Sequence, residues 1–337
     1  MRLAILDLLT IKTARHSAFR SRRQVLLATI AVLFLNSCRS ATEPCTDCWT
    51  TKASMLTPDV EFGVGVMNGI LYAVGAVVQA YDPVANSWTT KASMPTRRGG
   101  LGVGVVNGVL YAVGGEDGLY HCPFGGAPGP GPFLGVVEAY DPVANTWTTK
   151  ASMPTPRARF GVGVTNGVLY AVGGSNCSGV AGDRVEGYDP VTDTWTSKAS
   201  LPTAGGDLRV GVVDGVLYAI RGEGGNCSSS STVVESYDPV ANAWTTKAPM
   251  PTQREAFGIG VVDGVLYAVG GYGCGSSFSV SAVEAYDPVS DTWTTKASML
   301  TPSEGLGVGV VGGVLYAVGG ENTLLITIVG TNEAYQP

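Results

Sequence analysis

The chain has 337 residues and a formal net charge of −6, and only 14% of its residues are charged. A nucleic-acid-binding surface needs a basic face, so this balance argues against nucleic acid as a partner. The hydrophobic fraction of 45% is enough to fill a large core, and the 47 glycines and 19 prolines predict many turns.

The N-terminal segment has the features of an export signal rather than of a folded domain. A basic segment precedes an apolar stretch, residues 25–35, that is too short to span a membrane. The stretch ends in Leu-Asn-Ser-Cys, which resembles the bacterial lipobox, whose cysteine is diacylated. We therefore expect residues 1–37 to be a signal peptide, Cys38 to be the lipidation site and residues 38–47 to be a tether.

The segment 21–27, Ser-Arg-Arg-Gln-Val-Leu-Leu, also resembles a twin-arginine export motif. An ordinary Sec signal with basic residues is the alternative. Either route predicts an exported protein that is lipid-anchored at a bacterial cell envelope, on its periplasmic or surface face. The lipid anchor would then be its sole contact with the membrane.

Seven cysteines are consistent with an oxidising compartment. Cys45 and Cys48 have the spacing of some zinc and redox sites, but no second pair accompanies them. We therefore expect a disulfide or free thiols there and no metal site. Six cysteines allow many pairings, which the sequence leaves open. The disulfide candidates are Cys45, Cys48, Cys122, Cys177, Cys227 and Cys274.

The main signal in the sequence is an internal repeat marked by tryptophan. From Trp147 onward the tryptophans recur every 48 or 49 residues, a period in the range of propeller blades. Segments around each of them are nearly identical. The six tryptophans are Trp49, Trp88, Trp147, Trp195, Trp244 and Trp293.

Each repeat predicts four short strands. The first two are joined by a two-residue turn of the type that tolerates positive φ, such as Asn166-Gly167. The second strand, Val-Leu-Tyr-Ala-Val, is apolar on both faces, as expected of a blade packed between two neighbours. The third and fourth strands meet at Tyr-Asp-Pro, where a turn is favoured. The other turns are Asn68-Gly69, Asn107-Gly108, Asp214-Gly215, Asp263-Gly264 and Gly312-Gly313.

Partial repeats at the two ends of the array predict how the ring closes. The last unit supplies three strands and stops at Pro337, whereas the first supplies only an outer strand, residues 48–55. Three strands and one strand make a complete sixth blade. We therefore expect the N-terminal outer strand to pair with the three C-terminal strands, which removes the open edges of a linear array.

Gly-Gly after the second strand, Tyr-Asp-Pro and the following tryptophan resemble the Kelch repeat over residues 48–337. The resemblance implies an all-β fold, a six-bladed Kelch-type β-propeller with four antiparallel strands in each blade. Two repeats depart from the pattern, with Gly75-Ala76 in blade 1 and Arg221-Gly222 in blade 4 in place of Gly-Gly.

The connections that vary between repeats are expected to gather at one end of the propeller, as in a binding face on a rigid scaffold. Counting back from each hairpin turn gives two sets of equivalent positions at the mouth of the channel. The first set is Asp59, Arg98, Arg157, Gly205, Arg254 and Ser303. The second set, two residues later, is Glu61, Gly100, Arg159, Asp207, Ala256 and Gly305.

Arginines in these sets suggest a site for an anion. In Kelch domains of adaptor proteins, arginines at similar positions line a pocket for acidic peptides, and Arg157-Ala-Arg159 resembles that pattern. The alternative is that Arg98, Arg157 and Arg254 pair with nearby acids and only hold loops. The acids considered for this role are Asp59, Glu61, Asp207 and Glu255.

Blade 4 carries two further candidates for ligand binding. Arg209 stands where the other five blades have glycine in the inner strand, and Arg221 replaces the first glycine of the Gly-Gly pair. By contrast, the glutamates that precede the tyrosines recur at equivalent strand positions, which indicates a structural role. These glutamates are Glu138, Glu186, Glu235, Glu284 and Glu333.

These features favour a binding module over an enzyme, with a protein, a peptide or an acidic glycan as its ligand. A sugar-acting enzyme of the sialic-acid mutarotase type and a passive structural subunit of the envelope remain alternatives. A Kelch-type copper oxidase needs several histidines, and outside the signal only His121 is present. We expect a monomer that has no cofactor and no metal, and we identify no catalytic residues.

Overall fold

The chain divides into two units, Met1–Thr46 and Asp47–Pro337, and the second contains the described strands. Among the described residues the regular elements are all strands, and no helix is long and apolar enough to cross a membrane. The computed structural model describes residues 45–117, 133–176, 182–221, 232–273 and 278–337.

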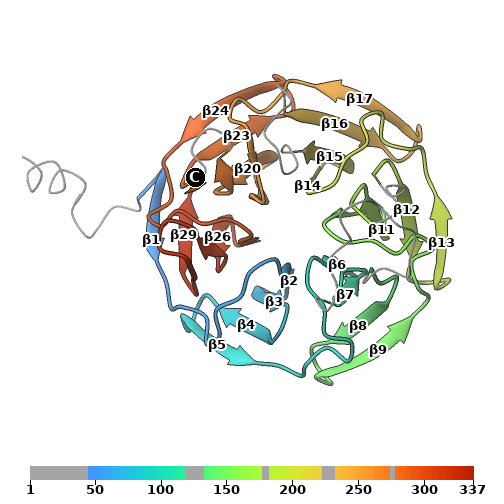
Figure 1. Ribbon diagram of the computed structural model, residues 1–337, viewed down its shortest axis with the longest axis horizontal. Coiled ribbons are helices and arrows are strands. Elements are labelled where there is room, and N and C mark those ends of the chain that lie inside the picture. Colours follow the sequence, from blue (N-terminus) through green and yellow to red (C-terminus); the bar gives the residue numbers. More distant parts are fainter. Residues whose placement is uncertain (1–44, 118–132, 177–181, 222–231, 274–277) are drawn as a thin grey trace, which may run out of the picture. The chain divides into compact units, whose positions relative to one another are not determined.

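Six four-stranded antiparallel sheets, the blades, follow one another around a central channel in the described part of the chain (Figure 1). The first strand of each blade lies next to the channel and the fourth lies at the rim. In blades 1 to 3 these strands are β2 (Gly63–Met67), β3 (Ile70–Val74), β4 (Val78–Asp82) and β5 (Ser87–Thr90); β6 (Gly102–Val106), β7 (Val109–Val113), β8 (Val137–Asp141) and β9 (Thr146–Lys150); and β10 (Gly161–Thr165), β11 (Val168–Val172), β12 (Val185–Asp189) and β13 (Thr194–Ser197).

Blades 4 and 5 continue the pattern, and blade 6 takes strands from both ends of the array. Two short hairpins and one short strand accompany blades 5 and 6. From channel to rim the blades are β14 (Leu208–Val213), β15 (Val216–Arg221), β16 (Val233–Asp238) and β17 (Ala243–Lys247); β19 (Gly258–Val262), β20 (Val265–Val269), β23 (Val283–Asp287) and β24 (Thr292–Lys296); and β25 (Gly307–Val311), β26 (Val314–Val318), β29 (Asn332–Gln336) and β1 (Cys48–Thr51). The additional strands are β18 (Arg254–Glu255), β21 (Tyr272–Gly273), β22 (Phe278–Ser279), β27 (Glu321–Asn322) and β28 (Thr327–Ile328).

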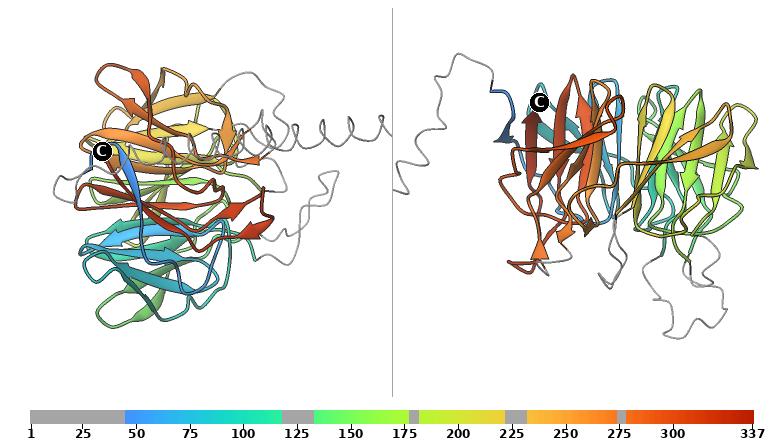
Figure 2. Two further views of the ribbon diagram at one scale, coloured as in Figure 1. Left: turned by 90° about the vertical axis from the view of Figure 1, so that its left-hand side faces the viewer. Right: turned by 90° about the horizontal axis from the view of Figure 1, so that it is seen from above.

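The two ends of the channel differ in the connections that they carry. The predicted two-residue turns have positive φ at both positions, for example 51° at Asn166 and 76° at Gly167, and they lie at one end, the turn end. The connections between second and third strands and those between blades lie at the other end, the mouth end. Figure 2 shows the strands running between these two ends.

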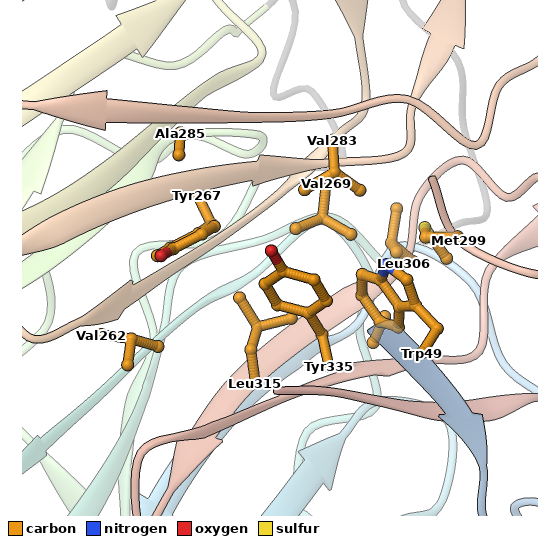
Figure 3. Packing of buried hydrophobic residues seen from close by; sticks show 11 residues of the cluster. Trp49, Val262, Tyr267, Val269, Val283, Ala285, Met299, Leu306, Leu315 and Tyr335 are labelled. Carbon is orange, nitrogen blue, oxygen red and sulfur yellow. The ribbon is translucent and has the colours of Figure 1, made fainter. Parts of the chain in front are cut away.

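The hydrophobic core lies between neighbouring blades rather than within one blade. Between blades 5 and 6, Tyr267 and Val269 of β20 pack against Leu315 of β26 and Tyr335 of β29, and Trp49 of β1 covers the rim side (Figure 3). Every other pair of neighbouring blades has an equivalent cluster. Because both faces of the blades are buried in this way, the second strands are apolar, apart from Arg221 at the end of β15.

Near the axis the blades come so close that glycine is required. A Cβ atom on Gly102 of β6 would lie 2.2 Å from Cγ2 of Val162 on β10 in the next blade. Equivalent contacts recur at Gly63, Gly161, Gly258 and Gly307. The Gly-Val alternation of the inner strands therefore places a valine of one blade over a glycine of its neighbour.

Closure of the ring follows the predicted arrangement. β1 pairs antiparallel with β29, with Cys48 opposite Gln336 and Thr51 opposite Glu333. Trp49 Nε1 donates to the carbonyl oxygen of Ala297 at 2.8 Å, as each other tryptophan does to the preceding blade. This register places Cys48 at the turn end of the propeller.

Candidate functional site

A cavity of about 180 Å³ lies in the channel at its mouth end. Residues of the inner strands of all six blades, or residues just before those strands, line its wall. Glycine and aliphatic side chains form most of the wall. The charged residues among those lining it are Glu61, Arg159, Asp207 and Arg209.

A ring of backbone hydrogen bonds fixes the rim of this cavity. The second set of equivalent positions forms the ring, and all six residues have φ between 51° and 59°. Each N–H points to the preceding blade, and five donate to the carbonyl oxygen of its equivalent residue. These bonds are Glu61 to Gly305 at 2.9 Å, Gly100 to Glu61 at 3.0 Å, Arg159 to Gly100 at 2.8 Å, Asp207 to Arg159 at 3.0 Å and Gly305 to Ala256 at 2.8 Å.

The sixth link, between blades 4 and 5, uses side chains. The N–H of Ala256 donates to Oδ2 of Asp207 at 3.1 Å. Arg209 donates to Oδ1 of the same carboxylate at 3.1 Å and to the carbonyl oxygen of Phe257 at 2.9 Å. Arg209, which replaces the inner-strand glycine, thus links blades 4 and 5, and it also lines the cavity.

The other charged side chains at the mouth also form pairs. Arg159 lies 3.3 Å from Glu61 and 3.2 Å from Glu116, and the side chains of Arg159 and Glu61 are 46% and 43% exposed. Because exposed pairs of this kind contribute little to stability, these groups can exchange partners when a ligand arrives. They are therefore available for recognition.

Carboxylates outnumber guanidinium groups around the mouth. Burial raises the pKa of Glu304 to about 7, and repulsion from Glu321, Glu255 and other acids of the mouth adds to this effect. The mouth therefore carries carboxylates beside the arginines that were expected from the sequence.

Comparison with known proteins supports the interpretation of the repeats. The model of the Kelch motif matches residues 97–154, 156–202, 205–251 and 253–300. The chain belongs to the Kelch-repeat family. A Kelch propeller of this kind is a general scaffold for binding or for catalysis.

Short segments of the chain resemble parts of longer proteins. A 44-residue segment is 52% identical to Kelch-like ECH-associated protein 1A of Danio rerio, and a 43-residue segment is 56% identical to Influenza virus NS1A-binding protein homolog of Mus musculus. Each segment covers 13% of this chain and 7% of the relative, so the chain spans a small part of these proteins. The solved structure of YjhT has a TM-score of 0.70 at 16% identity, covering 84% of this chain and 96% of that one.

The Kelch-repeat arginines of the first set are buried inside their blades. Arg98, Arg157 and Arg254 are at most 3% exposed. They pair with Glu138, Glu186 and Glu284, at 2.5 Å for the first pair and 2.9 Å for the third. The prediction that these three arginines line the channel mouth is therefore wrong.

The alternative partners considered for these arginines are also wrong. Each arginine instead meets the glutamate that recurs on the third strand of its own blade. Burial lowers the pKa of each guanidinium, and the neighbouring carboxylate opposes that change. The pairs hold the blade together and leave no group for a ligand.

Blades that lack this arginine show compensating changes within the same chain. In blade 1, Asp59 replaces arginine and Gln79 replaces glutamate, so two carboxylates do not meet. Asp59 accepts N–H groups of Val60 and Ala76, both at 2.9 Å, and burial raises the pKa of Asp59. Asp59 therefore has a structural role rather than the predicted role in ligand binding.

In blade 4 the arginine comes from another strand. Gly205 leaves a space that Arg221 of β15 occupies, since a Cβ on Gly205 would lie 2.4 Å from Cδ of Arg221. Arg221 donates to the carbonyl oxygen of Ala204 at 3.1 Å and is not among the residues that line the cavity. The candidates that do line it are Glu61, Arg159, Asp207 and Arg209.

No cysteine is among the described residues that line the cavity. Cys45 and Cys48 are both disulfide-bonded. The lipidation candidate Cys38, the loop residue His121 and the loop cysteines Cys122, Cys177, Cys227 and Cys274 lie outside the described residues.

Proposed function

We propose that this Kelch propeller is a binding module that recognises a protein or peptide through its mouth end. The observation that carries the proposal is the cavity at the mouth, lined by exposed charged pairs and enclosed by a rigid ring. The equivalent positions of the ring differ in charge from blade to blade, whereas the buried core repeats. Variation restricted to one end of a rigid scaffold is typical of a binding face.

The size of the cavity favours one side chain as its occupant rather than a whole ligand. Sites for drug-sized molecules usually enclose about 300–1,000 Å³. A cavity of about 180 Å³ is smaller and suits a side chain that projects from a larger partner. This favours a protein or peptide over a glycan.

We also propose that the protein is exported and anchored through Cys38, with residues 1–37 as a signal peptide. The sequence pattern supports this proposal, and Cys48 lies at the turn end, so the mouth end is clear of the point where the tether joins the propeller. Replacing Cys38 with serine should release the protein from the membrane fraction. Unchanged membrane association of Cys38→Ser would contradict the anchor.

Photo-crosslinking from the two ends of the propeller tests the binding proposal. A photoreactive phenylalanine replaces Arg159 at the mouth or, as the control, Val84 at the turn end, which is 98% exposed. Both variants are full chains produced in the source cells, and unchanged thermal unfolding verifies that each is folded. We expect a discrete protein adduct from position 159 and none from position 84. No adduct from the mouth, or the same adducts from both ends, would overturn the proposal.

A further inference from the structure

Two short hairpins of blades 5 and 6 form a joined surface at the mouth end. β21 and β22 make the hairpin of blade 5, and β27 and β28 make that of blade 6. The N–H of Ser279 donates to Oγ1 of Thr323 at 2.6 Å, and the N–H of Thr323 donates to Oγ of Ser279 at 3.2 Å. These reciprocal bonds join the two hairpins.

The joined hairpins, which we call the hairpin surface, expose a run of apolar side chains. Ile326, at the turn of the second hairpin, is 86% exposed and has a φ of 51°, a conformation that β-branched residues rarely adopt. A contiguous apolar patch in water typically marks an interaction site. Its exposed apolar residues are Phe278, Leu324, Leu325, Ile326 and Ile328.

An acidic pair lies directly beside the hairpin surface. Glu304 and Glu321 are opposite one another in an antiparallel bridge, with backbone N–H to O distances of 3.0 and 2.8 Å. Like charges directly opposite in a sheet destabilise it. Among the described residues neither carboxylate has an ion-pair partner within 4.0 Å, so no ion pair there relieves their repulsion.

The fold does not require two acids at this bridge. The equivalent bridge joins Gly99 to Glu116 in blade 2 and Ala158 to Ser175 in blade 3. Blade 6 therefore carries an unfavourable pair that other blades avoid. Departures from locally favourable choices of this kind are expected at functional sites.

We propose that the hairpin surface and the acidic pair together dock a protein segment in which lysine or arginine lies beside apolar side chains. Charge complementarity selects this partner, because its cation would sit against Glu304 and Glu321 while its apolar side chains cover the exposed apolar residues of the hairpin surface. The inference rests on the proposed function and names the partner's chemistry.

Designed peptides provide the probe. Three fluorescent 12-residue peptides alternate lysine with leucine, glutamate with leucine, or lysine with serine. Their affinity for the full chain in nanodiscs of zwitterionic lipid is measured by anisotropy, with empty nanodiscs as background. The variants are Glu304→Gln, Glu321→Gln and Leu325→Ser, and the controls at the turn end are Asp263→Asn and Val289→Ser.

Asp263→Asn is a matched control because it removes one negative charge and leaves the asparagine that three equivalent turns carry. We expect the lysine–leucine peptide to bind more tightly than the other two. Each of the three mouth-end variants should weaken its binding by about fivefold, the effect of one exposed charge or apolar contact worth about 1 kcal/mol. The two controls should bind as the unmodified protein does.

Two results would overturn the inference: equal binding of the three peptides, or equal affinities of the mouth-end variants and their controls. Unchanged thermal unfolding of the glutamine variants verifies that their loss of binding does not result from misfolding. If crosslinking from position 159 succeeds while the peptides do not discriminate, the binding face stands and only the partner's chemistry is wrong. If crosslinking fails, the binding function itself is wrong.

Discussion

At the scale of single residues, the buried arginines depend on their glutamates. Arg157 is fully buried, and Glu186 is its ion-pair partner among the residues that the structure describes. Removing one partner of such a pair leaves an uncompensated charge in the interior. Blade 6 offers a comparison, because Glu333 is equally buried but Ser303 stands at the position of the arginine.

Glu186→Ala should therefore lower the free energy of unfolding by about 3–5 kcal/mol at pH 7. Glu333→Ala leaves no uncompensated charge behind. It should lower the free energy of unfolding by about 1–2 kcal/mol, because only hydrogen bonds are lost. Denaturant unfolding of the two variants measures the difference. Equal losses would show that the buried ion pair is not what holds the blade.

The sequence located these residues but not the direction of their side chains. Counting from the hairpin turns found the equivalent positions, yet the first set points into the blade and the second set lines the channel. The positive φ at Arg159 reverses the direction of the side chains between the two sets. The residue types at this position do not indicate a positive φ. One signal was available, because the glutamate becomes Gln79 in the blade where arginine becomes Asp59.

At the scale of strands, the contacts near the axis determine which side chains the inner strands can have. The period-two alternation of glycine and valine was visible in the sequence, but its reason is the approach of the next blade. Arg209 breaks the alternation, and the ring of backbone bonds changes to side-chain bonds at that seam. The sequence alone identified Arg209 as the exception. The change from backbone to side-chain hydrogen bonds between blades 4 and 5 could be found only from the structure.

Gly102→Ala should destabilise the protein by about 1–3 kcal/mol, because the new Cβ would overlap Val162. Gly99→Ala is the control, since a Cβ there meets nothing within 4 Å. Thermal unfolding of both variants gives the comparison. If Gly102→Ala is as stable as Gly99→Ala, the inner strands are not packed as described.

At the scale of the whole molecule, an outer ring of hydrogen bonds unites the blades. Each third-strand tyrosine donates to an Asn or Asp side chain that also accepts an alanine N–H of the preceding blade. Asp47 completes this ring from the N-terminal side, accepting from Tyr335 at 2.6 Å and from Ala297 at 3.1 Å. Counting three C-terminal strands and one N-terminal strand was enough to predict the closure.

This ring predicts a specific sensitivity to acid. The tyrosine hydroxyl, followed by the alanine N–H, lowers the pKa of Asp47, Asp193 and Asp291. A lowered folded-state pKa stabilises the protein above the unfolded value of about 3.9, and the stabilisation is lost as pH falls through the folded value. The other blades carry Asn86, Asn145 and Asn242 at this place.

The triple variant Asp47→Asn, Asp193→Asn and Asp291→Asn should therefore lose less stability below about pH 4 than the unmodified chain. Unfolding is followed by tryptophan fluorescence between pH 2 and 7. The same acid dependence in both proteins would contradict the assignment of these carboxylates to the ring.

The central claim is that ligands bind at the mouth end and beside blades 5 and 6, not at the buried arginines. Amide hydrogen exchange of the full chain with and without the lysine–leucine peptide tests it most directly. We expect slower exchange in residues 255–258, 303–308 and 321–328, with no change in the turns at 84–86. Protection of those turns, or of no segment at the mouth end, would contradict it.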